Sequence, residues 1–210
     1  MDYAERLTQI SLEIIEQLNT KHLAREKSIQ ASREIIRLPA NSIRSVHRLE
    51  MNDALSLSER AGVKVLEIKD LVRLNHPDLY FSGYTQDAQK EYAEARICYA
   101  LISDLEVPSP SELGVEIAPY LNGMAEAASE LRRFILDSLR RDDDSRSEEL
   151  MSKMDESYNM MTGIDFPDAL TGGLRRTTDQ LRAVLERTRG DLTMAMRQRR
   201  LEKLLGKHER

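Results

Sequence analysis

Several residue types are scarce in this 210-residue sequence, and each scarcity excludes a class of protein. A single cysteine, Cys98, rules out an internal disulfide framework and suits a reducing environment, where a buried, inert thiol is expected. No apolar run approaches the ~20 residues that span a bilayer, and the N-terminus lacks the positive-then-apolar layout of a secretory signal. We therefore expect a soluble, cytoplasmic protein without a membrane partner.

The shortage of aromatic residues, glycine and proline favours helices over sheets. The chain has no Trp, three Phe, nine Gly and six Pro, while 32% of its residues are charged and 40% are hydrophobic. Apolar residues recur at three- and four-residue steps, and strict alternation over strand lengths is absent. The length suits one domain with a sizeable core. We predict an all-α fold in which residues 1–210 form a single domain.

The periodicity predicts about seven helices. Pro39 should end or kink the first helix, because proline lacks the N–H that a helix interior uses. Pro77 should end the third, because the residue before a proline is pushed out of helical conformation. Gly190 marks a weak point or an end of the last helix. The expected helices span about residues 2–38, 40–57, 58–74, 79–105, 110–141 and 145–161, then a loop over 162–173 and a final helix from 174 past 192.

Charge is distributed unevenly along the chain, although the net charge is only −5. Residues 21–48 hold seven Lys or Arg against two Glu, and residues 172–210 hold eleven against five acids. Residues 49–171 hold twelve basic and twenty-five acidic residues. The two basic segments keep nucleic acid among the candidate partners, despite the acidic total.

Two glutamates, Glu91 and Glu94, lie inside the apolar-periodic run over residues 79–105. At about 100° per residue, Glu91 falls on the apolar stripe and Glu94 lies about 60° away on its flank. The other members of the stripe are Tyr84, Ala88, Ala95, Cys98 and Ile102. An ionised carboxylate against apolar surface is costly unless it is paired, metal-bound or neutralised. Either a cation or a salt bridge to an arginine of another helix should compensate.

A second pair, Glu126 and Glu130, lies one helical turn apart in "YLNGMAEAASELRRF". Taken alone, this pair is typical of a solvated face, because Glu126 lies nearly opposite the apolar residues of its helix. If the two helices are antiparallel neighbours, four carboxylates could gather around Mg²⁺ or Mn²⁺, which prefer oxygen ligands. Such an ion activates water and stabilises charge on phosphorus, which would indicate phosphodiester cleavage.

The segments that hold these glutamates also resemble a known family. "EYAEA", followed about thirty residues later by "GMAEAASELRR", resembles the carboxylate signature of translin-associated factor X, the catalytic member of the translin family. "SREIIRLPANSIRSVHRLE" is similar to the family's first conserved helical region. "LTGGLRRTTDQLRAVLERTRGDLTMAMRQ" is similar to the C-terminal helix of its archaeal members. The resemblance covers about residues 31–198.

The resemblance implies a seven-helix, translin-type fold that assembles into a closed octamer and cleaves RNA inside it in a Mg²⁺-dependent reaction. It further implies that the metal-binding and catalytic residues are Glu91, Glu94, Glu126 and Glu130. The family's catalytic member usually has Asp at the position of Glu126. The extra methylene changes the reach of the carboxylate by more than the ~0.2 Å tolerance of metal–ligand distances, so we expect altered metal geometry.

The basic N-terminal segment corresponds to a region that contributes to the nucleic-acid surface in the family. Its candidate RNA-binding residues are Arg25, Arg33, Arg37, Arg44, His47 and Arg48. Cationic side chains of this kind neutralise phosphates without choosing a sequence, although a plain solvated face is the alternative. Tyr80, Phe81 and Tyr84 could stack on unpaired bases or could belong to the core.

Two main functional hypotheses follow. The first is a Mg²⁺- or Mn²⁺-dependent endoribonuclease that cleaves single-stranded or loosely paired RNA inside a homo-octamer. The alternative is a non-catalytic, translin-like oligomer that binds RNA or single-stranded DNA, in which the glutamates pair with Arg96, Arg132 or Arg133. A helical scaffold that binds only protein is a third possibility.

Overall fold

The computed structural model describes residues 2–208, and this part of the chain forms nine helices and no strand. The six long helices are α1 (Tyr3–His47), α2 (Met51–Val72), α4 (Gly83–Ser103), α6 (Ile117–Leu139), α7 (Ser147–Thr162) and α9 (Leu174–His208). Three one-turn helices lie in the connections: α3 (Pro77–Tyr80), α5 (Pro110–Leu113) and α8 (Asp168–Thr171). The all-α prediction is confirmed.

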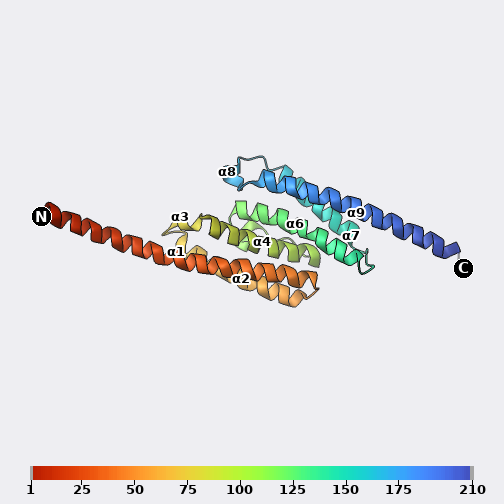
Figure 1. Cartoon of the computed structure of the whole chain (residues 1–210), viewed down its shortest axis with the longest axis horizontal. Coiled ribbons are helices and arrows are strands. Elements are labelled where there is room, and N and C mark those ends of the chain that lie inside the picture. Colours follow the sequence, from red (N-terminus) through yellow and green to blue (C-terminus); the bar gives the residue numbers. More distant parts are fainter. Residues whose placement is uncertain (1, 209–210) are drawn as a thin grey trace.

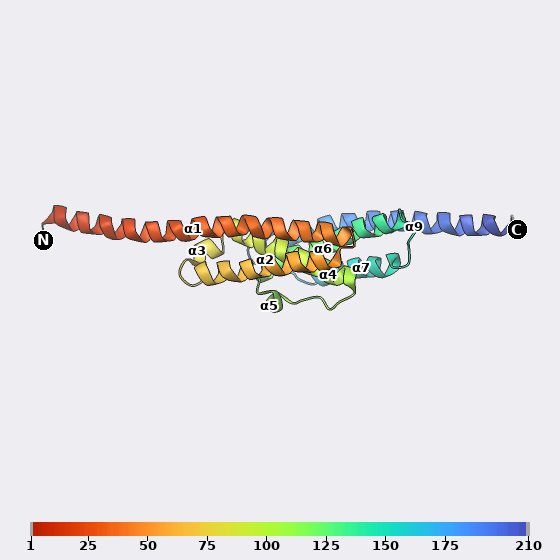
Figure 2. The ribbon, with the colours of Figure 1, turned by 90° about the horizontal axis from the view of Figure 1, so that it is seen from below.

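Helices α4 and α6 pack side by side in the middle of the molecule (Figure 1). Helices α1 and α2 cover one side of this pair, and α7 and α9 cover the other. The N-terminal part of α1 and the C-terminal part of α9 project beyond the body in opposite directions (Figure 2). Within residues 2–208, no helix combines the length and the apolar character that a membrane crossing requires.

Buried hydrophobic side chains from all six long helices form one cluster. The largest fully buried side chains include Ile35, Tyr80, Ile97, Leu131, Ile135, Leu150, Met154 and Leu181. Because α4 and α6 are covered on both sides, most positions around these two helices are buried rather than only one stripe. Polar groups on the two central helices are therefore drawn into the interior.

Pro39 lies inside α1, which continues to His47, so the predicted break is wrong. Ile35 and Val46 on either side of the proline are buried, and this packing against α2 and α4 outweighs the missing N–H. The chain turns after His47 instead, with Leu49 at a positive φ of 64°. As a result, the two helices predicted over 40–57 and 58–74 are replaced by the end of α1 and a single α2.

The remaining boundaries differ from the predicted ones mainly by short turns. Helix α2 ends at Val72, shortly before the stop predicted at Pro77, and Pro77 opens α3. The helix expected over 79–105 is divided into the end of α3 and α4. Ser109 caps only α5, and Pro119 lies in the first turn of α6. Helix α9 passes through Gly190, because Leu185 and Leu192 anchor it on both sides, so the predicted end there is wrong.

Candidate metal centre

Three glutamates from α4 and α6 meet in the middle of the molecule. One carboxylate oxygen from each of Glu91, Glu94 and Glu126 lies within 4.8 Å of the others. Glu94 is buried, with 8% of its surface exposed, whereas Glu91 and Glu126 are half-buried. Oxygens at this spacing can converge on one hard divalent cation such as Mg²⁺ or Mn²⁺. The residues present therefore fit a metal ion.

Gly123 allows α6 to approach α4 closely at this point. A Cβ at this position would lie 2.7 Å from the carbonyl oxygen of Lys90 and 3.0 Å from the backbone nitrogen of Glu94. Only a residue without a side chain fits there, even though glycine lowers helix stability by about 1 kcal/mol relative to alanine. The close approach carries Glu126, one turn further along α6, to the glutamates of α4. The sequence signal for this contact is a glycine inside an otherwise strong helix.

The electrostatics of the cluster favour a bound positive charge or a proton. Burial, followed by the negative charges of Glu126 and Glu91, raises the pKa of Glu94 to about 9. In the absence of a cation, this upward shift of the pKa favours the protonated form of the Glu94 carboxyl. A divalent cation would remove the same repulsion and would displace that proton.

Lys90 is the basic partner of the cluster, and sequence reasoning missed it. Its Nζ donates to Glu126 at 2.5 Å and lies 3.2 Å from Oε1 of Glu91. A salt bridge to an arginine of another helix was one of the two expected forms of compensation, but Arg132 pairs with Asp191 instead. The compensating cation comes from α4 itself, next to Glu91 in the sequence.

Glu130, the fourth predicted carboxylate, is held by a different group. Its Oε2 lies 2.6 Å from Nε2 of His47, whose side chain is only 2% exposed. Glu130 lies outside the set of three whose oxygens converge within 4.8 Å, although its negative charge still contributes to raising the pKa of Glu94. His47 was expected at an RNA-binding surface, whereas its side chain is buried and contacts Glu130.

The helical wheel predicted the burial of these residues only in part. Glu91 was placed on the apolar stripe, but Glu94 is the more deeply buried of the two. Glu126 was read as solvated from its own helix, yet its neighbours Asn122 and Gly123 are buried. Both differences arise because α4 and α6 pack closely against each other at this point.

Comparisons with known proteins show the protein family to which this chain belongs. No family model matches the sequence. The uncharacterized protein MJ0175 of Methanocaldococcus jannaschii is 31% identical over 182 residues, which is 85% of this chain and 79% of that protein. The crystal structure of AfC3PO, a C3PO-like protein of the translin family, is 31% identical with a TM-score of 0.82, over 89% of this chain and 97% of that chain. The chain belongs to the translin family.

Two further structures of translin-family proteins match. The complex of AfC3PO with duplex RNA gives a TM-score of 0.81 at 30% identity, over 89% of this chain and 96% of that chain. Apo-NeC3PO gives a TM-score of 0.74 at 21% identity, over 90% of this chain and 96% of that chain, and this likeness shows the fold alone. The family resemblance read from the three sequence segments is confirmed.

In this translin-family chain, the basic residues predicted on α1 do not form one uniform surface. Arg33, Arg37 and Arg44 are exposed and fall within about 40° of one line on the face opposite the buried one. Among the described residues, no carboxylate forms an ion pair with these three, which we call the arginine stripe. Arg25 pairs with Glu26 and Arg48 pairs with Glu50, although both remain exposed.

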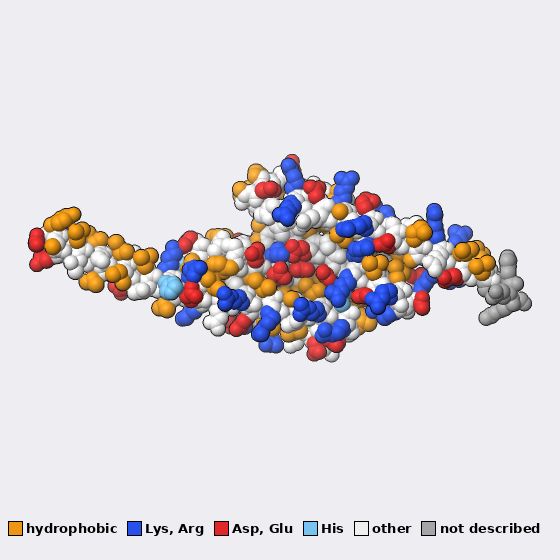
Figure 3. All heavy atoms as spheres, in the orientation of Figure 1, with side chains coloured by type: hydrophobic (Ala, Val, Ile, Leu, Met, Phe, Trp, Pro, Cys, Tyr) orange, Lys and Arg blue, Asp and Glu red, His pale blue; other side chains and the backbone are white. Residues whose placement is uncertain are grey.

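The space-filling view shows how these charges lie relative to the cluster (Figure 3). Acidic side chains gather at the centre of the face, over α4 and α6, and Lys and Arg side chains lie below them, where α1 and α2 run.

Cys98, one turn beyond Glu94, is buried, and burial raises the pKa of its thiol. This agrees with the expected inert cysteine.

Proposed function

We propose that this translin-family protein is a divalent-metal-dependent endoribonuclease that cleaves single-stranded or loosely paired RNA inside a closed homo-oligomer, an octamer by family resemblance. The observation that carries the proposal is the convergence of Glu91, Glu94 and Glu126 within 4.8 Å. The complex of the relative AfC3PO with duplex RNA supports RNA as the binding partner. The arginine stripe supplies positive charge that would attract the RNA backbone.

The proposed roles follow from the contacts of each side chain. Glu91, Glu94 and Glu126 would hold Mg²⁺ or Mn²⁺, and an ion bound there would polarise the phosphate and lower the pKa of water. Lys90 can transfer its donated hydrogen bond from Glu126 to a phosphate oxygen and so neutralise charge during cleavage. Glu130 is the proposed fourth carboxylate, and His47 fixes one of its oxygens, which leaves the other to orient water.

The decisive experiment measures cleavage of end-labelled RNA with Mg²⁺ by the protein and by a Glu91→Gln, Glu94→Gln variant. The amide side chains keep the shape of the site but bind a hard cation poorly, so cleavage should fall by at least about a hundredfold. Glu67→Gln, at an exposed position of α2, is the matched control and should cleave normally. Unchanged cleavage by the double variant would rule out this catalytic site.

The contacts of Lys90 favour a second candidate function, in which the protein binds nucleic acid without cleaving it. Its ammonium already compensates Glu91 and Glu126, as in a protein whose carboxylates are purely structural. In that case the protein would be a non-catalytic oligomer that binds RNA or single-stranded DNA. Salt-sensitive binding without any Mg²⁺- or Mn²⁺-dependent cleavage would favour this alternative.

A further inference from the structure

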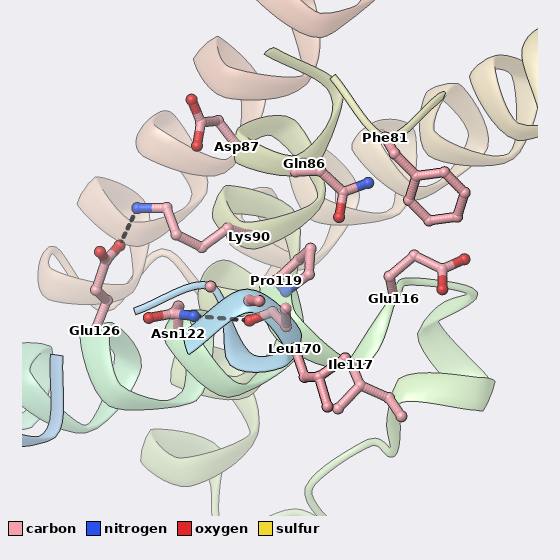
Figure 4. Close-up of a pocket in the computed structure, with 13 residues that line it drawn as sticks. Phe81, Gln86, Asp87, Lys90, Glu116, Ile117, Pro119, Asn122, Glu126 and Leu170 are labelled. Atoms are coloured by element: carbon pink, nitrogen blue, oxygen red, sulfur yellow. Dashed lines mark hydrogen bonds and ion pairs between the residues drawn. The ribbon is translucent and has the colours of Figure 1, made fainter. Parts of the chain in front are cut away.

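A groove of about 620 Å³ opens directly beside the glutamate cluster. Lys90 and Glu126 form one end of it, and Phe81 and Ile117 lie toward the other, as Figure 4 shows. Its volume falls in the range of about 300–1,000 Å³ that is typical of small-ligand sites. The groove is therefore continuous with the candidate metal centre and large enough for part of a nucleotide chain.

Phe81 is an exposed aromatic side chain on a well-anchored stretch of backbone. It is 57% exposed, and its ring meets the ring of buried Tyr80 edge-on, with 5.0 Å between centroids. The hydroxyl of Tyr80 donates to Glu116 at 2.9 Å, and the amide of Gln86 donates to the carbonyl oxygen of Tyr80 at 3.1 Å. These contacts fix the segment that presents the Phe81 ring to the groove, so the ring can offer a stacking surface at little entropic cost.

The charges that line the groove indicate which part of a nucleotide fits. Asp87, Glu116 and Glu126 line the groove, and Lys90 is the one cationic residue among the lining residues, so the lining itself is net acidic. Arg73, just outside the groove, pairs with Glu116 at 3.3 Å and offsets part of that charge. In the part of the groove that lies away from Lys90, such a lining repels a phosphate. Base amino groups and ribose hydroxyls, in contrast, can donate hydrogen bonds to the carboxylates. The phosphate consequently belongs at the metal end, and an uncharged base belongs near Phe81.

We propose that this groove is a nucleobase subsite, in which an unpaired base next to the phosphate at the glutamate cluster stacks on Phe81. The amino groups and ribose hydroxyls of that nucleotide face Asp87 and Glu116. The inference deepens the proposed nuclease function and rests on it for the position of the phosphate. A paired base cannot enter the groove, so stacking on Phe81 would favour unpaired over paired RNA.

The absence of tryptophan from the chain permits a direct optical test. A Phe81→Trp variant carries one indole at the proposed stacking surface, and Phe166→Trp places one at a similarly exposed position, 64% exposed, that does not line this groove. Both are made in the Glu91→Gln, Glu94→Gln background, so that RNA stays intact. Oligoadenylate should quench the Phe81→Trp emission saturably and leave the Phe166→Trp emission unchanged. An abasic ribose-phosphate oligomer of equal length should quench neither.

Binding affinity provides a second measurement that does not depend on the tryptophan variants. Phe81→Ala should weaken binding of oligoadenylate about tenfold, as loss of one base–aromatic stack predicts, while Phe166→Ala leaves it unchanged. Equal quenching by the abasic oligomer, or no quenching together with unaltered affinity of Phe81→Ala, would overturn the subsite. Neither readout involves cleavage, so a failed nuclease test and a failed subsite test are distinguishable.

Discussion

The glutamate cluster and the arginine stripe are the two charged regions from which a function can be argued, and they are built in different ways. The cluster lies between two central helices, where Gly123 brings backbones together and one carboxyl is 8% exposed. The stripe consists of Arg33, Arg37 and Arg44 on the outer face of α1. Burial amplifies interactions within the cluster, whereas water and salt screen those of the stripe.

This contrast shows how sensitive each region should be to substitution. A buried cluster depends on side-chain positions that neighbouring helices fix to a few tenths of an ångström, so one change can abolish its function. An exposed stripe acts through the sum of its charges, so each member contributes a small and similar share. Substitutions in the cluster should therefore have the largest effects, and substitutions in the stripe the smallest.

Gly123→Ala should disrupt the cluster. The new methyl group would lie 2.7 Å from the carbonyl oxygen of Lys90, so α6 must move away from α4. We expect a loss of about 2 kcal/mol in the free energy of unfolding, measured by chemical denaturation, together with loss of Mn²⁺ binding. Gly190→Ala is the matched control: it has open space and should stabilise α9 by up to about 1 kcal/mol. A stabilising Gly123→Ala substitution would contradict the close helix contact.

Glu94→Gln should remove a pH dependence of stability in the metal-free protein. The pKa of Glu94 is raised in the folded state to about 9, so the unfolding free energy is highest below its ordinary value near 4.5. It then falls as pH rises, by at most about 1.4 kcal/mol per pH unit for one group, and levels off above about pH 9. Denaturation in EDTA at pH 5 and pH 8 should therefore show Glu94→Gln more stable than the unmodified protein only at pH 8. Equal pH slopes for both proteins would refute the shift.

The helical character and the pairing of α4 with α6 were predictable from the sequence, but the partners within the cluster were not. Periodicity placed Glu91 and Glu94 toward the interior, and the family resemblance added Glu126 and Glu130. The contact of His47 with Glu130 joins residues 83 positions apart, and His47 is the last residue of α1, which continues through Pro39. Local propensity predicts a break at that proline, whereas the packing of α1 on two neighbouring helices overrides it.

Lys90→Gln should increase the affinity of the cluster for Mn²⁺ by about tenfold. The ammonium of Lys90 now neutralises Glu91 and Glu126, and an entering dication must displace it against charge repulsion. Isothermal titration calorimetry or electron paramagnetic resonance of Mn²⁺ measures the change. Lys153→Gln, which removes a lysine of similar exposure that pairs with Asp104 and Glu149, should leave the affinity unaltered. A decrease with Lys90→Gln would mean that the lysine instead organises the carboxylates.

Single alanine substitutions at Arg33, Arg37 or Arg44 should have the smallest effects. Each should lower the affinity for RNA by about two- to fivefold, because each removes about one solvent-screened contact with a phosphate. The loss should be independent of base sequence, and each substitution should reduce the slope of log affinity against log salt by about one. Fluorescence anisotropy of labelled RNA over a salt series measures both quantities. Arg140→Ala, at the exposed residue that directly follows α6 and far along the chain from the stripe, is the control and should leave both unchanged. If one arginine of the stripe alone accounted for most of the RNA affinity, that arginine would act as a specific contact, as the residues of the glutamate cluster do. The stripe would then not act through the sum of its charges, and its contrast with the cluster would not hold.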